Sequence, residues 1–167
     1  MKLTALKVDP EFQGKIPPLT FEELEQLEKN IVNDGKVINP IIVWNRLIVD
    51  GHNRYAILQK HPDIPYTVHE KEFADRFEVI IWICKNQLGR RNLSPEQKNY
   101  LLGKQYEAEK VAHGGDRKSA DAKSSYHNDN LISGEKTCDR IAKENGVNRI
   151  TVIRAEKFAN CVDEAEK

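Results

Sequence analysis

The most evident chemistry in this sequence lies where an apolar segment meets a helical one, at Gly51 and the nearby Arg54. The apolar runs 40–44 and 47–49 predict two strands joined by a tight turn, and residues 53–60 predict a helix. A helix N-terminus presents backbone N–H groups that lack intrahelical partners, so it attracts anions. Because Arg54 adds a cation there, the sequence predicts an anion or phosphate site. The plainer alternative is a turn and a helix cap, with Arg54 in a surface ion pair.

A second set of residues, from Cys138 to Phe158, has the spacing of a DNA-binding helix-turn-helix. Small or apolar residues stand where two helices would cross, as at Ala142 and Val152, and Gly146 stands in the turn. Arginine can bond guanine and asparagine can bond adenine. The candidate DNA-binding residues are Asn148, Arg149, Thr151 and Arg154. The alternative is an ordinary helical hairpin with a glycine turn.

The elements that must position these residues follow from capping signals and apolar spacing. Thr20 with Glu23 forms a capping box, and Ser94 followed by Pro95 and Gln97 marks another helix start. The predicted helices are 20–33, 53–60, 74–87, 94–111, 136–144 and 148–159. The predicted strands are 5–8, 40–44, 47–49 and 64–69.

Charge and composition restrict the classes of function. The formal net charge is zero, so no field of the whole chain attracts nucleic acid, although residues 136–157 hold six basic and three acidic residues. Cys84, Cys138 and Cys161 are widely spaced, which argues against a disulfide framework or a zinc site and favours a reducing cytosol. The sequence shows no signal peptide and no apolar run of about 20 residues. We therefore expect a cytoplasmic protein without a membrane partner.

Residues 3–112 resemble the N-terminal domain of ParB-type partition proteins, which has the ParB/sulfiredoxin fold. The matching segments, in order, are 24–31, Gly35 with 40–43, 49–56, 86–90 and 93–95. The helix-turn-helix extends the resemblance over most of the chain. The resemblance implies an α+β fold, a small mixed-sheet ParB/sulfiredoxin-like domain followed by an all-helical helix-turn-helix region.

The expected organisation has four parts. Residues 1–88 form the α/β domain, and residues 89–112 form a connecting helix with a phosphate-box loop at its start. Residues 114–135 are rich in Gly, Ser, Asn, Asp and Lys, which is typical of a linker. A flexible linker is therefore expected over 113–135, followed by a DNA-binding region over 136–167.

The resemblance also implies site residues. In the family, a Gly-x-x-Arg box holds the phosphates of a nucleotide, commonly CTP, and here that box is Gly51, His52, Asn53 and Arg54. The second phosphate box falls on Asn86, Gln87 and Arg90, with Arg91 beside it. Asn86 and Gln87 replace the family's Glu and Asn, which help hold magnesium, so they are weak metal candidates. We therefore favour the hypothesis that the chain binds a nucleotide and does not hydrolyse it efficiently.

The expected function is that of a DNA-binding ParB-like protein of a plasmid, phage or mobile element, acting in partition or regulation and associated with the nucleoid or a plasmid. The implied partners are DNA, a second protomer and a partition ATPase. One alternative is a metal-dependent nuclease or NTPase on the same fold, such as a weak CTPase. Another is a transcriptional regulator whose first domain is only an interaction module. The thiol chemistry of sulfiredoxins is not expected, since segment 50–55 has no cysteine.

Overall fold

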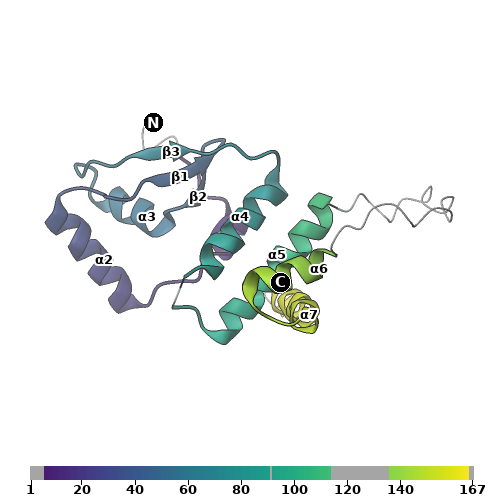
Figure 1. The fold of residues 1–167 in the computed structure, drawn as a ribbon. Helices are drawn as coiled ribbons and strands as arrows, with labels where there is room; N and C mark the ends of the chain where they lie inside the picture. The colour runs from purple at the N-terminus through teal and green to yellow at the C-terminus, as the bar shows by residue number, and fades with distance from the viewer. Residues whose placement is uncertain (1–5, 91, 114–135, 166–167) are drawn as a thin grey trace, which may run out of the picture. The chain divides into compact units, whose positions relative to one another are not determined.

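The computed structural model describes residues 6–90, 92–113 and 136–165 (Figure 1). The described residues form three strands and seven helices, which confirms the predicted α+β class. The strands are β1 (Ile41–Trp44), β2 (Leu47–Asp50) and β3 (Val68–Glu70). The helices are α1 (Pro10–Gly14), α2 (Phe21–Asp34), α3 (His52–Lys60), α4 (Arg76–Leu88), α5 (Pro95–His113), α6 (Thr137–Asn145) and α7 (Arg149–Ala165). The predicted linker lies outside the described residues, apart from residue 113.

The chain divides into two compact units, Met1–Ala74 and Asp75–Lys167. The sequence placed the end of the first domain at residue 88, whereas this division places α4 in the second unit, because α4 packs against α5. None of the helices in the described part of the chain is long and apolar enough to cross a bilayer.

The sheet of the first unit is mixed, with strand order β2-β1-β3. Strands β1 and β2 are antiparallel, and the turn between them places Asn45 and Arg46 at positive φ, as a tight two-residue hairpin turn requires. Strand β3 runs parallel to β1 on the other side. Lys7 forms an isolated parallel bridge with Leu47, which is all that the described residues show of the strand expected at 5–8.

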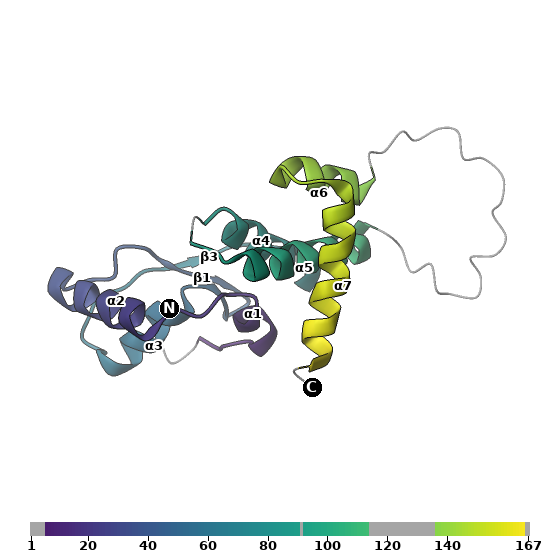
Figure 2. The same ribbon diagram turned by 90° about the horizontal axis from the view of Figure 1, so that it is seen from below.

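Helices α2 and α3 pack on this sheet through one apolar cluster (Figures 1 and 2). Its fully buried members include Ile41, Ile48 and Ile57. The capping box of α2 forms as predicted, because Thr20 Oγ1 accepts from Glu23 N at 3.2 Å and Glu23 Oε2 accepts from Thr20 N at 2.9 Å. Helix α2 therefore begins at the predicted capping residue.

The second unit is helical, and α5 contacts α4, α6 and α7 within it. Helices α5 and α7 meet at Gly103, where a Cβ atom would lie 2.2 Å from the backbone oxygen of Ala155 and 2.9 Å from the Cβ of Ala159. A side chain at residue 103 would therefore force the two backbones apart. Figure 2 shows α7 crossing α5.

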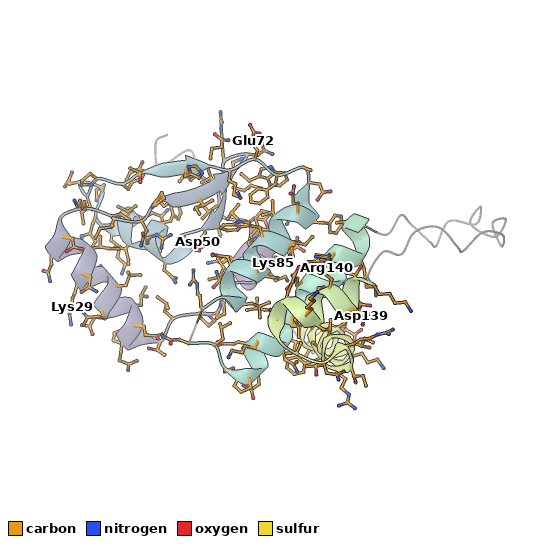
Figure 3. All side chains as sticks on the ribbon, in the orientation of Figure 1. Lys29, Asp50, Glu72, Lys85, Asp139 and Arg140 are labelled. Atoms are coloured by element: carbon orange, nitrogen blue, oxygen red, sulfur yellow. The ribbon has the colours of Figure 1, made fainter. Side chains whose placement is uncertain are left out.

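Ion pairs add to this packing around Glu109, a carboxylate that is only 1% exposed on α5. Glu109 accepts from Arg140 of α6 and lies 3.5 Å from Nζ of Lys85 on α4. Glu144 of α6 lies 3.1 Å from the same Lys85 atom. Figure 3 labels Lys85 on α4 and Arg140 on α6. Ion pairs therefore join α4, α5 and α6 to one another.

Candidate functional site

The junction of β2 and α3 is built around Gly51, which has a φ of 100°. A residue with a side chain is strained in this left-handed region. A Cβ atom here would also lie 3.0 Å from Nη2 of Arg54. Gly51 provides no side-chain cap for α3, so the first N–H groups of that helix receive no such bond from it. The predicted Gly51 therefore lies at the start of α3, where backbone N–H groups lack intrahelical partners.

Arg54 lies across this glycine and is held by two bonds. Its Nη2 donates to Oδ2 of Asp50 at 2.9 Å and to the carbonyl oxygen of Pro40 at 3.1 Å. The side chain is 20% exposed, and its Nε is buried without a hydrogen-bond partner among the described residues. The guanidinium therefore retains donor capacity while it is paired with a carboxylate.

His52 is the first residue of α3, and its side chain is buried, whereas a residue that binds phosphate at the surface would be exposed. It is 6% exposed, and both of its ring nitrogens are buried with no partner in the described part of the chain. Burial lowers the pKa of His52, and the charge of Arg54 lowers it further, against the opposing effects of Asp50 and Asp9. The folded chain therefore favours the neutral form of the ring. Asn53, the third residue of the box, is half-buried.

The second predicted phosphate box lies in the second unit, at the end of α4. Asn86 is exposed, whereas Gln87 is 1% exposed and its Oε1 is buried without a partner among the described residues. Arg90 is exposed, and its backbone N–H donates to the Gln87 carbonyl at 2.9 Å. Arg91 lies outside the described residues. The described residues also contain no group of three or more His, Cys, Asp or Glu side chains arranged to hold a metal ion.

Helices α6 and α7 form at the two segments predicted to be helical, 136–144 and 148–159, and a turn at Gly146 joins them. Gly146 has a φ of 65° and ends α6, while Val147 N–H donates to the Ala142 carbonyl at 2.9 Å. Ile141 and Val152, two of the residues expected where the helices cross, are fully buried. Helix α7 extends to Ala165, six residues beyond its predicted end.

The four candidate DNA-binding residues differ in their surroundings. Asn148 Oδ1 accepts from Ile150 N–H at 2.9 Å, so this side chain caps α7. Arg149 Nε lies 3.6 Å from Oδ1 of Asp139. Thr151 is half-buried, and Arg154 is exposed with no ion pair within the described residues.

No family model and no curated protein matches this sequence. Two solved structures do match in fold. The C2221 form of a pNOB8-like ParB N-domain is 20% identical, with a TM-score of 0.66 over 93% of this chain and 66% of that chain. A second pNOB8-like ParB N-domain is 20% identical, with a TM-score of 0.60 over 95% of this chain and 62% of that chain. This chain has the ParB N-domain fold.

The resemblance expected from the sequence is thereby confirmed at the level of fold. In this ParB N-domain fold, the acidic and basic residues of 136–157 differ in whether they form ion pairs with described residues. All three acidic residues of 136–157 are in ion pairs, Asp139 with Arg149, Glu144 with Arg140 and Lys85, and Glu156 with Lys110. The basic residues of this window with no ion pair to a described residue are Lys136, Lys143, Arg154 and Lys157. The free charge on the hairpin is therefore positive.

Two features of this ParB N-domain fold were missed by sequence reasoning. One is Gly103, although a glycine inside a helical pattern is a signal of close packing. The other is the set of ion pairs around Glu109, which joins residues far apart in the chain and leaves no local signal.

Proposed function

We propose that this chain is a ParB-like, partition-type protein that binds DNA through α6 and α7 and a nucleotide phosphate through the β2–α3 junction. The observation that carries the proposal is the ParB N-domain fold, which aligns with 93% of the chain. Only 7% of the chain lies outside that alignment, so it includes residues of the α6–α7 hairpin as well as the sheet.

The DNA-binding part rests on the charges of the hairpin. Lys143, Arg154 and Lys157 are exposed and have no ion pair with a described residue, so they are free to neutralise phosphates. Binding that releases counterions weakens steeply as salt rises. Fluorescence anisotropy with a labelled duplex should show this dependence for the 167-residue chain. The variant with all three residues changed to alanine should lose most of this salt dependence. Lys36→Ala, which changes an exposed lysine of the first unit, is the control and should keep it.

The nucleotide part rests on the geometry around Gly51. The start of α3 has no side-chain cap from Gly51, and Arg54 has a buried Nε without a partner in the described residues. A bound phosphate would take the place of Asp50 as the anion beside Arg54. Calorimetry with CTP, and then with the other nucleoside triphosphates, tests this with and without magnesium. Arg54→Ala should abolish binding and Lys36→Ala should not.

Failure of either experiment identifies the part that is wrong. If duplex DNA binds and no nucleotide binds at millimolar concentration, the β2–α3 junction is a structural turn. If the duplex does not bind at low salt, the hairpin is a packing element. A dimer whose association responds to nucleotide, measured by sedimentation velocity, would support a partition-type role, and a partition ATPase would then be the partner to test.

A further inference from the structure

One face of α7 is exposed and has a mixed apolar and basic character. Ile150 is 56% exposed, and Arg154 and Lys157 are exposed as well. Spacings of four and three residues place these side chains on a single face of the helix. The buried residues Val152, Ala155 and Ala159 occupy the opposite face. We call the residues Ile150, Arg154 and Lys157 the outward face of α7.

The residues beside the outward face are engaged within the chain. Asn148 caps the first turn of α7, and Arg149 pairs with Asp139 across the hairpin. In contrast, Arg154 and Lys157 have no ion pair with a described residue. The outward face therefore presents one branched apolar side chain near the start of α7 and two cations beyond it.

We propose that the outward face reads a thymine in the major groove of DNA, with Ile150 against the thymine methyl group. This inference rests on the proposed DNA-binding function and adds the class of base that is recognised. The methyl group of thymine is the apolar feature of the major groove, whereas the other base-edge groups are donors and acceptors. Ile150 has no polar atom in its side chain, so it matches the methyl group and none of the others.

The cations determine the choice of partner. Two copies of this face would bring Arg154 and Lys157 close to the same residues of a second protomer, which is unfavourable, whereas DNA supplies the opposite charge. Arg154 follows Ile150 by four residues, about 6 Å along the helix, which corresponds to about two base-pair steps. The arginine therefore contacts a base or phosphate near the thymine, and Lys157 contacts the backbone beyond it.

The test begins with selection of duplexes from a random library by the 167-residue chain. Each thymine of the enriched duplex is then replaced singly by deoxyuridine, which removes only the methyl group. We expect one position where binding falls about fourfold, the size expected for one methyl group lost from an apolar contact. Ile150→Ala should remove the sensitivity at that position. Val111→Ala, which shortens another exposed apolar side chain of a helix, should preserve it.

The outcomes separate this inference from the function on which it rests. If the chain binds DNA and no deoxyuridine position matters, or if Ile150→Ala keeps the same sensitivity, the thymine contact is overturned and DNA binding stands. If Ile150→Ala instead weakens self-association in sedimentation velocity without changing any base preference, the outward face is a protomer contact and the inference is also overturned. If no duplex binds at low salt, the proposed DNA-binding function fails and the inference fails with it.

Discussion

Nη2 of Arg54 lies 2.9 Å from Oδ2 of Asp50, so the arginine expected to bind phosphate already has an anionic partner. Both side chains are largely buried, at 20% and 13% exposure. A phosphate that binds at Gly51 must compete with this carboxylate, and its charge is also repelled by it. Asp50 is therefore expected to hold the side chain of Arg54 in place and also to limit the affinity of the site for phosphate.

Asp50→Asn should raise the affinity for a nucleotide phosphate about fivefold, because it removes a competing charge whose interaction with Arg54 is about 1 kcal/mol. The same change should lower the free energy of unfolding by about 1 kcal/mol. Calorimetry and urea unfolding measure the two effects. Asp34→Asn, an exposed acidic residue at the end of α2, is the matched control and should change neither quantity. Weaker binding by Asp50→Asn would show that the carboxylate supports the site.

Gly103→Ala should destabilise the second unit by about 3 kcal/mol, because overpacking that shifts backbones has effects of this size. The new Cβ atom would lie 2.2 Å from the backbone oxygen of Ala155, and a backbone atom cannot rotate away. Gly89→Ala is the control, since its Cβ would have no closer neighbour than 3.6 Å. It should change the free energy of unfolding by less than about 0.5 kcal/mol in the same urea titration. Equal effects of the two variants would contradict the close crossing of α5 and α7.

Glu109→Gln should lower the free energy of unfolding by about 2 kcal/mol, because it leaves Arg140 and Lys85 without their buried partner. This loss is smaller than the loss of about 3–5 kcal/mol expected when a fully buried ion pair is broken, because the pair is only partly buried. The side chain of Arg140 is 35% exposed and it keeps Glu144. Thermal unfolding of Glu25→Gln provides the comparison, since the exposed pair of Glu25 with Lys29 should contribute less than about 0.5 kcal/mol. A loss no larger than that of the control would mean that the three helices do not depend on this carboxylate.

His52 should make the stability of the first unit depend on pH. Its pKa is lowered in the folded chain, chiefly by burial, so the unfolded chain binds the proton more tightly. The contribution of His52 to the free energy of unfolding is therefore complete above the unfolded pKa of about 6.5. It is lost as the pH falls through the folded pKa. Urea unfolding between about pH 5 and pH 8 should show this slope, and His52→Asn should flatten it. An NMR titration that gives the ring a pKa above its usual value would refute the prediction.

Local signals in the sequence predicted much of this fold. The box of Thr20 with Glu23 and that of Ser94 with Gln97 both form, because each depends on groups three residues apart. The turn at Gly146 was also predicted from a local signal, since a left-handed residue after a helix favours glycine. Helix α1 was not predicted, although Asp9 caps it and Pro10 begins it, because five residues show no apolar period.

The candidate site was harder to predict, because its geometry depends on residues that the fold brings together. The sequence predicted Arg54, but its bond to the Pro40 carbonyl requires the β1–β2 hairpin. His52 was predicted as a phosphate-box residue, and its burial depends on how α3 packs. Similarly, no pattern within α4, α5 or α6 indicates that Lys85, Glu109 and Arg140 meet.

The close approach of α5 and α7 at Gly103 restricts one side of α7 and leaves the other side free to vary. Helix α7 is fixed against α5 by contacts on one side, at Ala155 and Ala159, while Ile150, Arg154 and Lys157 project from the other. Exchanges on the outer side need no repacking of the interior. Substitution of these three residues would therefore change the binding face that we propose and leave the helix packing intact, whereas a side chain at position 103 would destabilise the unit.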